Sequence, residues 1–111
     1  MNPGLTFKRD GSWHARGKYS RCLNLYCRKC NHLICVYQKD GPGNLRRLYF
    51  DRIFSPKKFV DLQHKNLKDV SNLNCINCKE LLGIPYTYTK EKRKAFKLFQ
   101  DAIIKRLRKL N

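Results

Sequence analysis

Hydrophobic and polar residues alternate along two consecutive stretches in the first half of the chain, YSRCLNLYC and NHLICVYQ. Period-two alternation of this kind is typical of β-strands that are buried on one face. A cluster of turn-forming residues, KDGPGN, follows, and LRRLYFDRIF then has the composition of a third strand. The pattern therefore predicts a three-stranded antiparallel meander with turns at residues 27–30 and 39–44.

A short helix is predicted immediately after this meander. Ser55 is a favourable N-cap and Pro56 a favourable first helical residue. Phe59, Val60 and Leu62 then supply an apolar face. The later stretch ELLGIPYTY predicts one more short strand.

Residues 89–110 show apolar side chains at three- and four-residue steps, which predicts a long amphipathic helix. Lysine and arginine dominate its other positions. Those in the last turn suit the negative end of the helix dipole, whereas those in the first turn oppose the positive end, so we expect a weak first turn unless an anion binds there. The apolar positions are Phe96, Phe99, Ile103, Leu107 and Leu110.

Four of the six cysteines form two CxxC pairs. Two CxxC turns can place four thiolates at the corners of a tetrahedron, which Zn²⁺ prefers with sulfur at about 2.3 Å. No secretory signal is evident, so we expect a cytoplasmic location in which cysteines stay reduced and bind metal. Neither pair precedes a predicted helix, which argues against a thioredoxin-like redox role. The predicted ligands of one structural Zn²⁺ are Cys27, Cys30, Cys75 and Cys78.

Cys22 and Cys35 remain outside this ligand set. With a two-residue turn between Cys27 and Cys30, they would face each other across the hairpin. Because side chains alternate along a strand, they would point away from the face that carries the metal ligands. We interpret them as small buried core residues, and a cross-strand disulfide or a second metal stays open as an alternative.

These elements together predict an α+β fold, with a small zinc-stabilised, ribbon-like antiparallel β-sheet, one short helix and a long basic C-terminal helix. A chain of 111 residues suits one domain and gains from a metal staple. We expect residues 1–18, which lack hydrophobic periodicity, to form a flexible basic N-terminal tail. Residues 19–111 would form a single zinc-binding domain that ends in the amphipathic basic helix at 89–110.

The two CxxC motifs resemble those of zinc-ribbon and zinc-knuckle proteins. Residues 75–86, CINCKELLGIPY, are also similar to the second knuckle of Yippee-type β-tent proteins, where a Leu-Gly pair and an aromatic residue follow the CxxC. Here these residues are Leu82, Gly83 and Tyr86. Ile84 stands where that family usually has tryptophan, and neither the first knuckle nor the basic C-terminal helix has a counterpart. The resemblance implies a zinc-clamped β-sheet and does not indicate a partner.

The formal net charge is +17, from 25 lysines and arginines against 8 acidic residues. This exceeds what solubility requires and predicts a polyanionic partner. Nucleic acid is the expected partner, with an anionic membrane surface as the less favoured alternative, and no apolar run of about 18 residues is present that could span a membrane. RNA is favoured over DNA because no helix with polar, base-reading side chains is evident. Structured RNA, such as that of the ribosome, would be recognised through its shape and phosphates.

Candidate phosphate contacts fall into two groups, one in the predicted C-terminal helix and one around the third strand and short helix. The nearby loop KDGPGN lacks the GK[ST] of a Walker motif, so we interpret it as a plain turn. The first group is Lys92, Arg93, Lys94, Lys97, Lys105, Arg106, Arg108 and Lys109, and the second is Arg46, Arg47, Arg52, Lys57 and Lys58.

Two other classes of function are alternatives to nucleic-acid binding. A zinc-stabilised adaptor could dock on a protein partner through its sheet or C-terminal helix, and both functions can coexist in a ribosome-associated factor. Catalysis is not expected, because no acid–base pair or nucleophile stands out and four cysteines would close the coordination sphere of the metal. We therefore expect no small-molecule substrate.

Overall fold

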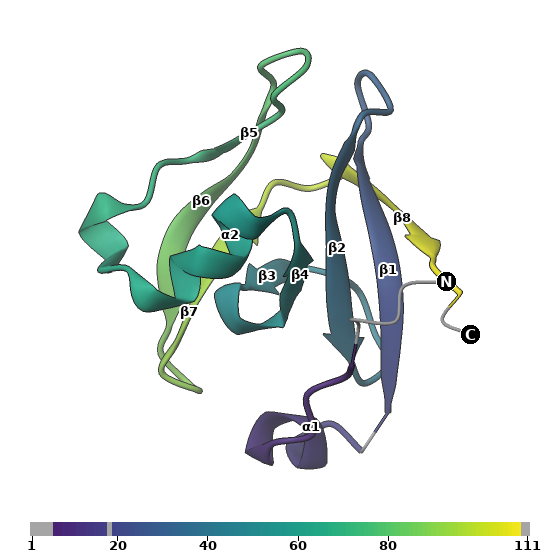
Figure 1. Cartoon of the computed structure of the whole chain (residues 1–111), viewed down its shortest axis with the longest axis vertical. Coiled ribbons are helices and arrows are strands. Elements are labelled where there is room, and N and C mark those ends of the chain that lie inside the picture. The colour runs from purple at the N-terminus through teal and green to yellow at the C-terminus, as the bar shows by residue number, and fades with distance from the viewer. Residues whose placement is uncertain (1–5, 18, 110–111) are drawn as a thin grey trace.

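Two antiparallel four-stranded β-sheets form most of the protein in a computed structural model, which describes residues 6–17 and 19–109 (Figure 1). The first sheet has the order β4-β2-β1-β8 and the second β3-β7-β6-β5. The strands are β1 (Ser20–Cys27), β2 (Leu33–Asp40), β3 (Arg47–Tyr49), β4 (Ile53–Ser55), β5 (Leu73–Asn74), β6 (Leu81–Tyr88), β7 (Arg93–Leu98) and β8 (Ile103–Leu107). The helices are α1 (Gly11–Ala15) and α2 (Lys57–Val60), with 3₁₀ turns at Phe50–Arg52, Asp61–His64 and Leu67–Asp69.

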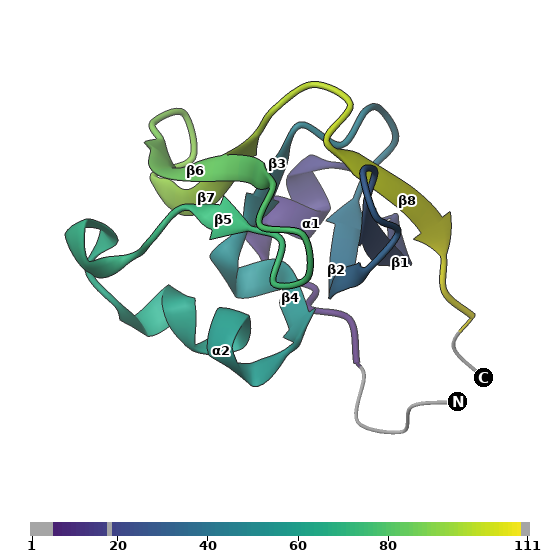
Figure 2. The ribbon, with the colours of Figure 1, turned by 90° about the horizontal axis from the view of Figure 1, so that it is seen from above.

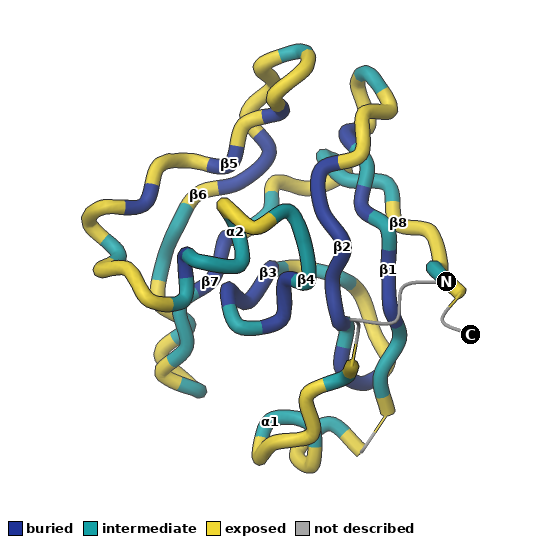
Figure 3. The backbone as a smooth tube through the Cα atoms, viewed as in Figure 1, coloured by how far each residue is buried: buried dark blue, intermediate teal, exposed yellow. Residues whose placement is uncertain are grey.

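The hydrophobic core takes side chains from both sheets. Leu25 of β1, Leu82 of β6 and Phe96 of β7 are fully buried within it, and Figure 3 shows a long buried stretch along β2. Phe50 packs edge-to-face on Phe96 with ring centroids 4.9 Å apart, and Phe59 of α2 covers the same ring. Helix α2 therefore closes one side of the core, as the apolar face of the predicted short helix requires.

The β1–β2 hairpin forms as the alternating pattern predicts, but the third strand of the predicted meander divides between the two sheets. Its first half is β3, which pairs with β7, and its second half is β4, which pairs with β2. The 3₁₀ turn at Phe50–Arg52 carries the chain from one sheet to the other. The predicted α+β fold with a single ribbon-like sheet is therefore wrong, since most of the described chain forms two antiparallel sheets.

The hairpin register also differs from the expected one. Cys22 lies opposite Gln38, and Cys35 lies opposite Leu25, so the two cysteines are not cross-strand partners. The turn is longer than two residues, because the Cys27 N–H donates to the carbonyl of His32. In addition, the strand register shifts between Leu25 and Tyr26. Both cysteines are nevertheless buried, as predicted.

The long C-terminal helix predicted for residues 89–110 is contradicted by the structure, which has strands β7 and β8 in this part of the chain. Strand β7 lies between β3 and β6, and β8 pairs with β1. Ala95 and Phe96 are adjacent and both buried, and Lys97 is exposed, so this stretch lacks the strict alternation that would have indicated a strand. Backbone pairing with distant strands thus overrides local helix propensity. Leu110 lies outside the described residues.

A close approach between β6 and β7 explains the Leu-Gly pair noted in the sequence. A Cβ atom at Gly83 would lie 2.7 Å from the carbonyl oxygen of Lys97, a distance that no larger residue tolerates without movement of the strands.

No helix within the described residues is long and apolar enough to cross a membrane.

The segment before β1 packs on the rest of the protein through polar contacts. The buried Gln38 amide donates to the Lys8 carbonyl and accepts from the Lys8 N–H, as a neighbouring strand would. Asp10 caps α1 and accepts from the buried guanidinium of Arg52 at 2.6 Å. This hydrogen bond, opposed by burial and helped by the Trp13 N–H, lowers the pKa of Asp10 to about 2. A predicted phosphate contact, Arg52, is therefore part of the internal structure.

We expect Arg52→Ala to lower the free energy of unfolding by about 3–5 kcal/mol, because it leaves the Asp40 carboxylate buried without its cation. Arg52 Nε lies 2.9 Å from Asp40, whose side chain is only 4% exposed. Urea unfolding at fixed metal concentration measures the change. Arg46→Ala, which removes an exposed arginine from the same region, is the matched control and should change stability by no more than about 0.5 kcal/mol. Equal stability of the two variants would contradict the proposed role of the pair.

Candidate metal centre and basic surface

The two CxxC pairs form turns of the same local structure at one end of the molecule. In the first, the Asn31 N–H donates to the Cys27 carbonyl, and in the second the Lys79 N–H donates to the Cys75 carbonyl. Asn31 and Lys79 occupy equivalent positions and both have left-handed backbones, with φ of 63° and 69°. Each hairpin tip is thus bent so that both of its cysteines face the same way, and Figures 1 and 2 show the two tips side by side.

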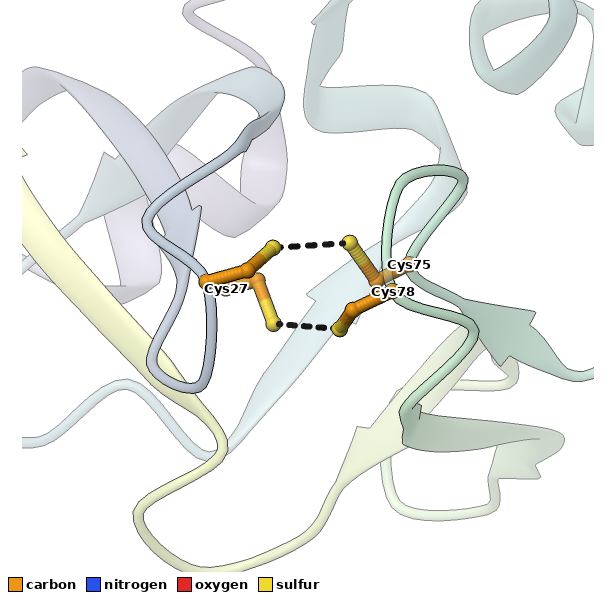
Figure 4. A group of neighbouring side chains, drawn as sticks. Cys27, Cys75 and Cys78 are labelled. Carbon is orange, nitrogen blue, oxygen red and sulfur yellow. Dashed lines mark hydrogen bonds between the residues drawn. The ribbon is translucent and has the colours of Figure 1, made fainter.

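The four sulfur atoms of these turns lie within 4.8 Å of one another. Cys27 Sγ and Cys78 Sγ are 3.6 Å apart, as are Cys30 Sγ and Cys75 Sγ (Figure 4). A tetrahedral metal with sulfur at about 2.3 Å needs sulfur–sulfur distances of about 3.8 Å, so the spacing fits one metal ion. The structure confirms that these four cysteines, predicted as ligands, lie together as a potential metal site.

Hydrogen bonds within and between the two turns favour ionised sulfur. A hydrogen bond with the Asn77 side chain, followed by the His32 N–H, lowers the pKa of Cys30 to about 6. The Glu80 N–H does the same for Cys78, but burial and the other three cysteines raise the pKa of Cys78 to about 12. Four thiolates therefore repel one another at this distance, and a bound cation would stabilise all of them. The Asn77 contact was not predicted from the sequence.

The basic residues next to the first cysteine pair contact the second CxxC turn and the connection between β7 and β8. Lys29 lies 3.6 Å from Glu80 of the opposite turn, in an exposed ion pair. The Arg28 N–H donates to the Ala102 carbonyl, and Arg28 Nε donates to the Asp101 carbonyl at 2.7 Å. The connection between β7 and β8 is thereby fastened to the first metal-binding turn.

Several predicted phosphate contacts have internal partners. Arg93 is 11% exposed, pairs with Asp51 at 2.7 Å and lies 3.6 Å over the ring of Tyr49. Lys94 Nζ donates to two backbone carbonyls, and Arg108 donates to Asn24 Oδ1. Together with Arg52, these residues hold the fold, and we leave them out of the candidate ligand-binding surface.

The other predicted contacts are distributed around the molecule. Lys57 pairs with Asp61 on α2, which Figure 2 shows on the opposite side of the molecule from the β7–β8 connection. Exposed residues elsewhere on the surface are Lys58, Lys92, Arg106 and Lys109. The remaining four, Arg46, Arg47, Lys97 and Lys105, line one cavity.

This cavity, here called the basic cavity, has a volume of about 850 Å³ and lies between the segment before β3 and the β7–β8 connection. Five basic residues line it, against a single carboxylate at Asp101. Leu45, Leu98, Ile103 and the aromatic rings of Tyr86 and Phe99 provide apolar surface. The sequence did not predict the cavity, because its walls come from segments about fifty residues apart.

Comparison with known proteins finds no matching protein-family model, no similar curated protein and no similar solved structure. The resemblance to zinc-ribbon, zinc-knuckle and Yippee-type proteins is therefore unsupported by a family match, and the cysteine cluster carries the metal assignment alone.

We expect Cys30→Ala to abolish stoichiometric metal binding and the cooperative thermal transition. The apparent free energy of structural zinc binding, about 10–16 kcal/mol in zinc-finger peptides, is comparable to the whole stability of a small domain. Elemental analysis of purified protein and thermal melting measure the two effects.

The matched control for this substitution is Cys22→Ala, which removes a buried thiol outside the cluster. It should keep one equivalent of metal and a cooperative transition. Loss of metal from both variants, or from neither, would contradict the four-cysteine assignment.

Proposed function

We propose that the protein is a zinc-stabilised nucleic-acid-binding module that contacts structured RNA mainly through phosphates. Zinc is the proposed metal because a closed set of four cysteine sulfurs in tetrahedral spacing is typical of structural Zn²⁺ sites. Such a site has no open coordination position, so we propose binding rather than catalysis.

The basic cavity is the observation that carries this proposal. Arg46 and Arg47 belong to one group of predicted contacts, and Lys97 and Lys105 to the other, yet all four line the same cavity. Among the described residues, the side chains of Arg46, Lys97 and Lys105 have no hydrogen-bond or ion-pair partner. Uncompensated cations on a concave surface raise the local concentration of a polyanion and release counterions when phosphates bind.

The net charge of +17 supports a polyanion as the partner, and the arrangement of strands favours RNA. Both helices of the described chain are short, so neither offers a recognition helix of the kind that reads the DNA major groove. Phosphate contacts on a rigid surface suit the shape-based recognition of folded RNA, including ribosomal RNA.

Affinity for a structured RNA should fall on the order of a hundredfold between about 50 and about 200 mM salt, if four phosphates are contacted. Filter binding or fluorescence anisotropy across a salt series measures this dependence. A flat response would contradict phosphate contact, and co-purification of a protein in place of RNA would favour an adaptor function.

A triple variant tests whether the basic cavity makes these contacts. Arg46→Gln/Lys97→Gln/Lys105→Gln should reduce the log–log salt slope by about three, because each phosphate contact contributes about one. Lys65→Gln/Lys68→Gln/Lys90→Gln removes the same charge from exposed positions outside the cavity and is the matched control. Equal slopes for the two triple variants would show that only overall charge matters.

A further inference from the structure

We propose that the basic cavity binds a single unstacked nucleotide of the RNA, with its base against Phe99 and Tyr86 and its phosphate on the surrounding cations. This inference rests on the proposed function, because it names the part of the RNA that the cavity receives. The cavity volume of about 850 Å³ lies within the range of about 300–1,000 Å³ that is usual for ligand pockets.

An exposed aromatic ring is the first observation that points to a nucleotide. Phe99 lines the cavity and is 46% exposed. The half-buried Tyr86 also lines the cavity. Phosphate contact alone needs no aromatic surface, whereas an unstacked base gains about 1–3 kcal/mol from stacking on an aromatic ring. Leu98 and Ile103 extend this apolar surface.

Cations beside the rings are the second observation. Arg47 Nε donates to Tyr86 Oη at 2.8 Å, and its guanidinium lies 4.0 Å from the ring centroid of Tyr88. These contacts fix the guanidinium at the side of the cavity. Lys97 is exposed in the strand position directly opposite Arg47, and Lys105 lies across the cavity on β8.

The walls of the cavity are held by backbone hydrogen bonds from separate elements. The Phe99 N–H donates to the Leu82 carbonyl, and the Ala102 N–H donates back to the Phe99 carbonyl. The Leu98 N–H donates to the Arg46 carbonyl, which joins the two walls directly. A preformed cavity of this kind binds a flexible nucleotide at a lower entropic cost than a mobile loop would.

Only nucleotides outside a double helix can enter the cavity, because paired bases are stacked on their neighbours. The proposal therefore predicts that the protein binds a stem-loop RNA more tightly than the blunt duplex of the same stem. The duplex retains phosphate contacts, so it should still bind with a steep salt dependence.

The experiment compares the binding of these two RNAs to the whole protein and to Phe99→Ala at one salt concentration. The substitution should weaken binding of the stem-loop about tenfold or more and leave duplex binding within about twofold. Phe99→Tyr should restore stem-loop binding. Tyr19→Ala is the matched control, since Tyr19 is an aromatic residue that is 47% exposed outside the cavity.

If the protein binds both RNAs equally and Phe99→Ala does not change either affinity, the nucleotide site is contradicted. RNA binding through phosphate contacts would still be supported by that result. Absence of binding to either RNA would overturn the proposed function itself. Thermal melting checks that each variant is folded. Phe99→Leu, which keeps apolar bulk without an aromatic ring, replaces Phe99→Ala if the latter melts without cooperativity, with the same expected loss.

Discussion

The approach of two pairs of cysteine sulfurs at the tips of separate hairpins is the constraint on which the rest of the structure depends. Cys27 ends β1 and Cys30 lies in the turn between β1 and β2 of the first sheet, whereas Cys75 and Cys78 lie between β5 and β6 of the second, so one metal ion would link the two sheets at one end. Hydrogen bonds with Asn77 and His32 lower the pKa of Cys30 to about 6, whereas the lowering effect of the Glu80 N–H on Cys78 is outweighed by burial and the three neighbouring cysteines, which raise the pKa of Cys78 to about 12. The metal would thus both fasten the sheets and relieve the repulsion between thiolates.

A buried ion pair supports the fold at the end of β2 that is opposite to the cysteine turn. Arg52 lies in the turn that carries the chain between sheets, and it bonds to Asp40 at the end of β2 and to Asp10 before α1. A chain with such an excess of positive charge thereby uses several of its few carboxylates inside the structure. Few carboxylates remain to pair with exposed cations, as Glu80 does with Lys29 and Asp61 with Lys57, and the basic cavity has only Asp101 against five basic residues.

The sequence was sufficient to predict that the four cysteines cluster and that residues 20–40 form a hairpin, because CxxC spacing and strand alternation are local signals, but it did not predict the register of that hairpin. It was insufficient for residues 89–110, where Phe96, Phe99 and Ile103 fit a helical period and the adjacent buried residues Ala95 and Phe96 break the alternation of a strand. Hydrogen bonds to β1, β3 and β6 decide between the two, and they join residues distant in sequence. The unfavourable basic residues at the start of the predicted helix were the one local signal against it. Tertiary structure also determines which residues pair with Arg52 and Arg93. It likewise brings Arg46 and Lys97 to the lining of one cavity.

Removal of the metal from the reduced native protein tests the central claim most directly. Circular dichroism and thermal melting would be recorded before chelation, after chelation and after addition of one equivalent of Zn²⁺. The account predicts that chelation abolishes the cooperative transition and that Zn²⁺ restores it. An unchanged spectrum and melting temperature in protein shown to be free of metal would contradict it.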